Sequence, residues 1–207
     1  MLGLYIGIIL LLNIPYVQHR MSVLVAKELS TVLGSELTVG RINIGLLNRI
    51  IIDDLVLNDQ SGKELLKIGR LSAKFEILPL FSGKISIGNV QLFSFNANLE
   101  RPTPQASTNF QFVLDAFASK DTVKKKSNLD LRINSLLIRR GKVSYDVLSA
   151  ESTPGKFNPQ HIRLSNILAN ISLKALQNDS VNAAIKRMSV EEEHSGFELK
   201  KLSLKII

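Results

Sequence analysis

The chain has 207 residues, 45% of them hydrophobic, no cysteine and a formal net charge of +8. This length suits a single domain with a sizeable core, and the lack of cysteine excludes disulfides and thiolate metal sites. The excess of positive charge would suit anionic lipid or nucleic acid. The basic residues are spread along predicted strands and form no motif interleaved with aromatic residues, so we expect a solvated basic surface and no nucleic-acid partner.

An uncharged apolar run opens the chain. Residues 2–17 are apolar except for Asn13 and are interrupted only by Pro15. The run lies at the short end of the roughly 17 to 25 residues that span a membrane, and it lacks the basic flank and small-residue cleavage site of a signal peptide. We predict an uncleaved N-terminal transmembrane helix over residues 1–18 in preference to a buried core helix. The basic residues that follow it would favour a cytoplasmic body.

A second helix is predicted over residues 17–33, and we delimit an amphipathic segment at 19–34. Gly34 suits a helix C-terminus, where a positive φ is common. The helix would lie on a membrane surface or, more commonly, cover the first strands. Its apolar stripe consists of Met21, Leu24, Val25, Leu29, Val32 and Leu33.

One hydrophobic spacing, with apolar residues at offsets 0, 2, 5 and 7, recurs along the rest of the chain. Apolar residues two apart face the same side of a strand, so the repeat predicts long strands with one apolar face. The first four sets are Leu37, Val39, Ile42 and Ile44; Ile50, Ile52, Leu55 and Leu57; Leu66, Ile68, Leu71 and Ala73; and Ile85, Ile87, Val90 and Leu92. The later sets are Leu131, Ile133, Leu136 and Ile138; Ile162, Leu164, Ile167 and Ala169; Ala183, Ile185, Met188 and Val190; and Phe197, Leu199, Leu202 and Leu204.

The step of three within each set would move the second pair of residues to the opposite face. A β-bulge in the gap inserts one residue, keeps both pairs on one face and bends the strand. A tight turn is the alternative, but it would leave strands of only about three residues. The predicted bulges lie at Gly40–Arg41, Asp53–Asp54, Gly69–Arg70 and Gly88–Asn89.

The predicted fold is therefore mainly β, a long curved antiparallel sheet with short amphipathic helices. Short polar turns between the strands imply antiparallel neighbours. A short helix over residues 109–118 carries Phe110, Val113, Leu114 and Phe117 at helical spacing, and a charged linker follows at 120–128. The strands are expected at 37–46, 49–58, 65–77, 84–100, 129–138, 142–148, 162–175, 181–190 and 197–206.

No catalytic constellation is present in the sequence. The histidines His19, His161 and His194 are scattered, without a second ligand at metal spacing, and the last two are expected in a loop and a hairpin turn. We therefore predict no enzyme activity, no catalytic or metal-binding residue and no cofactor.

The apolar face is wider than the predicted helices. Nine strands about 4.8 Å apart span roughly 40 Å, whereas a 17-residue helix is about 25 Å long and 10 Å across. The sheet must close on itself, pack on a partner or hold something apolar. The opposite face is expected to face water, because it carries Lys67, Arg70, Ser72, Lys74 and Glu76.

Several stretches resemble the N-terminal portion of the AsmA-like and TamB family of Gram-negative envelope proteins. They are the anchor and helix up to Leu33 with LGSELTV after it, IIIDDLVLND within 48–59, SGKELLKI at 61–68 and LPLFSGKISIGNV at 78–90. The resemblance is good over residues 1–118 and continues in style beyond them. Its motifs are spacings and turns rather than chemical residues.

The resemblance implies a single-pass inner-membrane anchor and a periplasmic β-groove domain (β-taco) over 35–207 that continues beyond this chain. We prefer this location to the one suggested by the few basic residues after the anchor. The family is related to chorein-type bridge proteins that carry phospholipids, so membrane phospholipids are the implied partners, with a TamA-like outer-membrane barrel contacted through a region absent here. The implied acyl-chain contacts are Ile42, Ile44, Leu55, Leu57, Leu71, Ala73, Phe75, Val90, Leu92, Leu136 and Ile138.

Two functions remain open. The first is an inner-membrane-anchored lipid conduit that moves phospholipid between the inner and outer membranes. The second is a structural or chaperone-like module of a machinery that assembles outer-membrane proteins, with a closed sheet or one offered to incoming strands. Uncovered apolar area distinguishes them, since a closed barrel fills with its own side chains.

Overall fold

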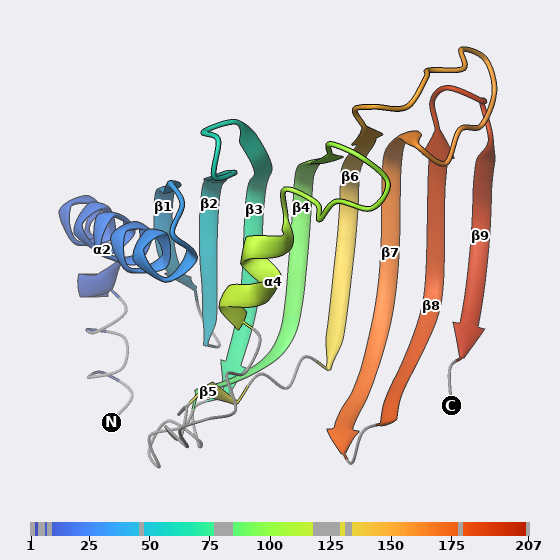
Figure 1. The fold of residues 1–207 in the computed structure, drawn as a ribbon. Coiled ribbons are helices and arrows are strands. Elements are labelled where there is room, and N and C mark those ends of the chain that lie inside the picture. Colours follow the sequence, from blue (N-terminus) through green and yellow to red (C-terminus); the bar gives the residue numbers. More distant parts are fainter. Residues whose placement is uncertain are drawn as a thin grey trace.

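The computed structural model shows one layer of β-sheet with two helices on one side of it (Figure 1). The sheet has nine strands in the order β1-β2-β3-β4-β6-β7-β8-β9, and β5 pairs with β4 outside this path. The mainly β fold predicted from the sequence is therefore confirmed. The residues that the structure describes are 10–45, 48–76, 85–117, 129–130, 134–177 and 180–205, together with Gly3 and Gly7.

The first four strands lie where the hydrophobic spacing predicts them, and the later ones need one correction. The predicted strands 129–138 and 142–148 are instead the two-residue β5 and one continuous strand, β6, that runs through the expected turn. The strands are β1 (Leu37–Gly45), β2 (Arg49–Asn58), β3 (Glu64–Glu76), β4 (Ile85–Arg101), β5 (Leu129–Asp130), β6 (Ser135–Val147), β7 (His161–Gln177), β8 (Ser180–Glu192) and β9 (Glu198–Lys205).

The prediction of a fully antiparallel sheet is wrong in one place. β4 pairs with both β5 and β6 in parallel, whereas all other neighbours are antiparallel. The connection between Arg101 and Ser135 is long enough to carry the chain back to the same end of the sheet, which a short turn cannot do. The sheet therefore consists of two antiparallel meanders, β1–β4 and β6–β9, joined by a parallel ladder.

Helix α2 (Pro15–Leu33) confirms the predicted amphipathic helix. Proline at its first position and Gly34 after its end, at φ 64°, are the residues that start and stop helices. The predicted stripe is wrong in part, because Leu24 and Val32 are 61% and 57% exposed. The buried side instead contains Ser22, which is 1% exposed, because its small side chain permits close approach.

Helix α2 protects the outer edge of β1. Just before the helix, the Asn13 side-chain amide donates to the Ile44 carbonyl at 2.9 Å. Within the helix, Ser30 Oγ accepts from the Leu37 N–H at 2.9 Å. Unpaired edge groups would otherwise be open to another strand. Within the described part of the chain, no helix combines the length and apolar character needed to cross a membrane. Part of the predicted span lies outside the described residues, as does the 120–128 linker.

Helix α4 (Gln111–Phe117) confirms the predicted short helix against the apolar face. It packs with α2 over a core of Leu33, Leu37, Leu57 and Leu65. Phe112, Val113 and Ala116 of α4 pack against this core, as does Phe110 just before the helix. The predicted Leu114 contact is wrong, since that side chain is 52% exposed. The side chain of Phe117 lies outside the described residues.

A line of unusual backbone crosses the sheet, and we call it the crease. Asp54, Ser94, Arg140 and Asn166 have φ of 55°, 53°, 55° and 51°. Glycine occupies the facing positions at Gly40 and Gly69, where an added Cβ would lie 3.0 Å from Asp54 Cβ and 3.3 Å from Ser94 Cβ. The left-handed residue on one strand thus sits beside a residue without a side chain on the next.

The crease replaces three of the four predicted bulges. The register of β1, β2 and β3 continues unchanged past Gly40–Arg41, Asp53–Asp54 and Gly69–Arg70, so no residue is inserted there. The bulge at Gly88–Asn89 is confirmed, because Lys74 pairs with Asn89 and Phe75 with Ile87. A left-handed residue also resets which side the following side chains face. It therefore explains the apolar spacing of 0, 2, 5 and 7 without a register shift.

Candidate functional site

Two apolar rows run across the sheet. Because the crease resets the direction of the side chains, we infer that the rows face the side that carries α2 and α4, which we call the inner face. In each row, every residue lies directly opposite the next one on the neighbouring strand, the arrangement in which cross-strand side chains touch. The first row is Ile42, Ile52, Leu71, Leu92, Ile138, Ala169, Met188 and Leu202. The second row is Ile44, Ile50, Ala73, Val90, Leu136, Ile171, Ile185 and Leu204.

The rows are covered at one end and open at the other. On β1 and β3, Ile42 and Ala73 are 3% and 9% exposed, and the small Ala169 on β7 is 3% exposed, whereas Leu204 on β9 is 48% exposed. Figure 1 shows α2 and α4 lying over β1–β4, and no described helix lies over β7–β9. The inner face of β6–β9 therefore presents apolar side chains that the described helices leave uncovered.

The predicted acyl-chain contacts divide into two groups. Ile42, Leu55, Leu57 and Ala73 are buried in the covered half, where they already pack against protein. The half-exposed group is Ile44, Leu71, Phe75, Val90, Leu92, Leu136 and Ile138. All of these except Phe75 belong to the two rows.

The continuation of the rows over β7, β8 and β9 was missing from the predicted site. Its half-exposed or exposed members are Ile171, Ile185, Met188, Leu202 and Leu204. The same hydrophobic spacing marked these residues in the sequence. The spacing gives the apolar face, however, and does not indicate which part of that face the helices cover.

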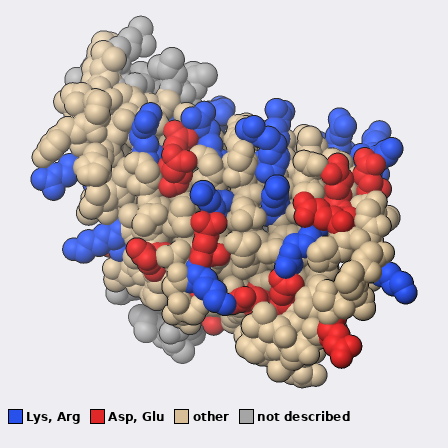
Figure 2. Space-filling view, turned by 90° about the horizontal axis from the view of Figure 1, so that it is seen from above, with Lys and Arg blue, Asp and Glu red and all other residues tan. Residues whose placement is uncertain are grey.

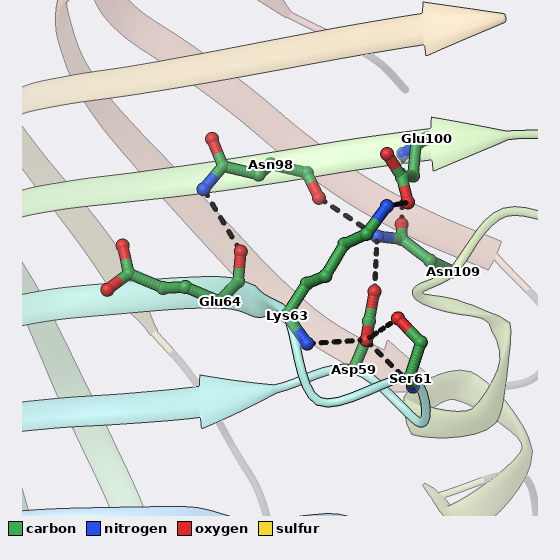
Figure 3. Close-up of polar contacts among 7 residues, drawn as sticks. All are labelled: Asp59, Ser61, Lys63, Glu64, Asn98, Glu100 and Asn109. Atoms are coloured by element: carbon green, nitrogen blue, oxygen red, sulfur yellow. Dashed lines mark hydrogen bonds and ion pairs between the residues drawn. The ribbon is translucent and has the colours of Figure 1, made fainter. Parts of the chain in front are cut away.

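A polar cluster ties the β2–β3 turn to β4 and to the start of α4 (Figure 3). Asp59 is 5% exposed, and its Oδ1 accepts from the Ser61 N–H at 2.8 Å and from the Lys63 N–H at 3.0 Å. Asn109 donates to the Asn98 carbonyl at 3.1 Å. Burial would raise the pKa of Asp59, but hydrogen bonds from Ser61, Lys63 and Asn109 outweigh it and lower that pKa. The carboxylate stays charged and fixes this end of the covered half.

A cavity of about 480 Å³ adjoins this cluster. Asp59 and Asn109 line it together with Phe112 of α4 and Leu148, which follows β6. The lining is thus mainly polar, with Phe112 and Leu148 as its large apolar side chains. The cavity lies at the strand ends, beside the apolar face.

A second polar cluster fixes the strand ends in the open half. Both ring nitrogens of His161 face acceptors, with Nδ1 2.9 Å from Asp146 Oδ1 and Nε2 3.0 Å from the Ala150 carbonyl oxygen. Arg163 Nη2 lies 2.7 Å from Asp146 Oδ2. These contacts to Asp146 and Ala150 raise the pKa of His161. His161 is the first residue of β7, and its ring joins this strand to Asp146 on β6. The prediction that it is a loop residue was wrong.

Glu192 closes the turn that follows β8. It is 3% exposed and accepts from the Ser195 hydroxyl at 2.5 Å, the Ser195 N–H at 2.8 Å and the Arg163 N–H at 3.2 Å. Burial would raise the pKa of Glu192, but these hydrogen bonds and one from the His194 N–H outweigh it and lower the pKa to about 2. The two clusters join neighbouring strands and turns, through Asn109 and the Asn98 carbonyl in the first and through Asp146, Arg163 and Glu192 in the second.

The opposite, outer face is largely polar, as predicted. Figure 2 shows Lys and Arg side chains gathered along one long side of the molecule, and Lys67, Arg70 and Lys74 are exposed. The prediction is wrong for Ser72, which is 4% exposed and lies 3.4 Å from Arg49 Nη1. The side chain of Glu76 lies outside the described residues.

Comparisons with known proteins assign no family to this geometry. No family model matches the chain, and no curated protein matches its sequence. The inner face and its two apolar rows are therefore the features from which a function can be inferred.

Proposed function

We propose that the protein binds phospholipid acyl chains along the open part of its inner face and acts as an inner-membrane-anchored periplasmic lipid conduit of the AsmA-like, TamB-like type. Lipid would pass between the inner and outer membranes with its acyl chains on the two rows. The observation that carries the proposal is the continuity of these rows over β4, β6, β7, β8 and β9, where their members are mostly half-exposed.

The energetics favour an apolar occupant. Each CH₂ group moved from water to an apolar surface contributes about 0.8 kcal/mol. An acyl chain on the rows also shields side chains such as Met188 and Leu202 that no described helix covers. A charge in the same place would lose hydration without gaining a partner. The site should therefore prefer hydrocarbon and tolerate a headgroup only at its polar margins.

A matched pair of variants on β4 tests the proposal. Val90 lies in the second row between Ala73 and Leu136. The preceding residue, Asn89, is exposed, and its side-chain oxygen accepts from the Ser135 hydroxyl at 2.9 Å. Asn89→Asp adds a charge and keeps an acceptor for that hydrogen bond. Val90→Asp places the same charge in the row. Lipid retained by the purified chain, measured by mass spectrometry, should fall sharply for Val90→Asp and remain unchanged for Asn89→Asp.

Folding must be monitored in the same samples. Circular dichroism establishes whether each variant keeps its sheet, and Leu204→Asp provides a second test on the edge strand, where 48% exposure makes unfolding a smaller risk. Equal lipid retention in folded Val90→Asp, Leu204→Asp and Asn89→Asp would contradict the conduit.

We further propose that residues 1–18 hold the protein at the inner membrane. The exposed apolar side chains Leu10, Leu11 and Tyr16, at 66%, 57% and 66% exposure, support this placement. Deletion of residues 1–18 should release the protein into the soluble periplasmic fraction. Removal of the intact protein from membranes by a carbonate wash would contradict the anchor.

The second candidate is a structural or chaperone-like module that works with a TamA-like outer-membrane barrel. It is favoured by the outer edge of β9, with which no strand pairs within the described residues. An incoming strand could pair there through its backbone. This candidate predicts no retained lipid and pairing of β9 with a client strand, which cross-linking from Lys201 to an unfolded outer-membrane protein would detect.

A further inference from the structure

We propose that the outer face carries a binding site for a phosphate ester anion, centred on Phe93 and the guanidinium groups of Arg139 and Arg140. The site lies on the opposite side of the sheet from the apolar rows and does not depend on acyl-chain binding. Two adjoining hollows define it, of about 340 and 430 Å³, and both are lined by Phe93 and Arg140. Arg70 borders the first and Arg139 the second.

The crease creates this arrangement. Consecutive residues of a regular strand point to opposite faces, yet Arg139 and Arg140 line one hollow together. Arg140 has φ 55°, and this left-handed conformation places its side chain on the same face as that of Arg139. Two arginines consequently line one hollow together with the half-buried Phe93.

Arginine is a poor choice for that backbone position. A left-handed conformation is strained for residues other than glycine, and asparagine and aspartate tolerate it best. The crease uses aspartate at 54, serine at 94 and asparagine at 166, all short polar residues, whereas Arg140 is long and charged. Backbone strain of this kind is concentrated at functional sites. An arginine that is kept at a strained position therefore points to a role for its guanidinium group.

The charges around the hollows leave the two arginines available. Asp53 is already engaged by Arg70, at 2.6 Å from its Nε, and Glu191 accepts from Asn166 at 2.6 Å. No ion pair or side-chain hydrogen bond with another described residue engages Arg139 or Arg140, and both are exposed. Guanidinium groups bind phosphate through paired, charge-assisted hydrogen bonds. Phe93 offers an apolar surface to the organic part of the same molecule.

The test compares two double variants of the full chain that remove the same charge. Arg139→Gln/Arg140→Asn removes the proposed ligands and puts a residue at 140 that accepts the left-handed backbone. Lys200→Gln/Lys201→Gln removes two charges from exposed positions on β9. The probes are glycerol 3-phosphate, measured by calorimetry, and phosphatidylglycerol-containing phosphatidylcholine vesicles, measured by flotation.

We expect the arginine double variant to lose affinity by about tenfold or more, because charge-assisted hydrogen bonds are lost. The lysine double variant should stay within about twofold of the unmodified chain, in keeping with general screening of surface charge. Arginine-dependent binding of glycerol 3-phosphate would assign a soluble phosphate ester, and arginine-dependent binding of vesicles alone would assign a lipid headgroup. Binding of neither probe, or an equal loss in both double variants, would overturn the site.

Discussion

The two meanders of this sheet carry the same apolar rows but differ in what lies on them. On β1–β3 the row residues Ile42 and Ala73 are 3% and 9% exposed, and Leu57 and Leu65 of the neighbouring core beneath α2 and α4 are 3% and 1% exposed. On β9 the row residues Leu202 and Leu204 remain half-exposed and exposed, respectively. One pattern of residues thus serves as a core in the first half and as an open apolar surface in the second. Coverage by helices, rather than strand sequence, decides which role the pattern has.

The largest expected effect is a loss of stability in the packed core of the first half. Leu65→Ala should lower the free energy of unfolding by about 2–5 kcal/mol, because it leaves a cavity in the packed core. Leu202→Ala on the open half should cost roughly half as much or less, since less of its surface is removed from water. Urea unfolding measures both. Equal losses would show that the open half is covered in solution.

The junction between the halves should be sensitive to a single methyl group. A Cβ added at Gly141 on β6 would overlap the ring of Phe95 on β4. Gly141→Ala should therefore cost about 1–3 kcal/mol of stability through overpacking. In a Phe95→Ala background the same change should cost little. An equal loss of stability with and without Phe95→Ala would show that the strain does not come from the Phe95 ring.

The strand ends of the open half should weaken in acid. Glu192→Gln should cost about 1–3 kcal/mol near neutral pH, because a charged acceptor of several hydrogen bonds is lost. The pKa of Glu192 is lowered from 4.5 to about 2, so the stability that it contributes is present above pH 4.5 and is lost as the pH falls toward 2. Thermal unfolding against pH checks this, with the exposed Glu193→Gln as control. An unchanged acid profile in Glu192→Gln would contradict the assignment.

The smallest expected effect has the opposite pH dependence. Both ring nitrogens of His161 need a proton to satisfy Asp146 and the Ala150 carbonyl, and the pKa of His161 is raised above 6.5. Its stabilising contribution is fully present below pH 6.5 and is lost as the pH rises through the raised value. His161→Gln should remove this decline from the melting temperature, and the exposed His194→Gln should not. A decline that persists in His161→Gln would assign it to another group.

Much of the sheet could be predicted because a strand repeats its side-chain direction every two residues. The sets ending at Ile44, Leu57, Ala73 and Leu92 place their strands correctly, and cross-strand pairing then generates the rows. The predicted strands 129–138 and 142–148 left Arg139-Arg140-Gly141 between them, although β6 runs through these residues. A left-handed residue inside a strand gives the same spacing as a bulge or a turn, so periodicity cannot separate these structures.

The remaining differences depend on contacts between distant parts of the chain. Ser72 has the composition of a solvated position, and its burial depends on a neighbour on another strand, Arg49. Leu24 and Val32 are apolar, yet the docked side of α2 is selected by the small Ser22. The candidate site was therefore predictable as a face, whereas its covered and open portions were not.

The parallel ladder between β4 and β6 also has a consequence for the order of folding. Each meander pairs strands that are close in sequence, whereas the ladder must first close the loop between Arg101 and Ser135, which costs chain entropy and slows formation. We expect the two meanders to form separately and to join last along this seam. Backbone amides of β6 should then exchange with solvent at lower denaturant than those of β2 and β3, so the sheet would open by parting into its two meanders.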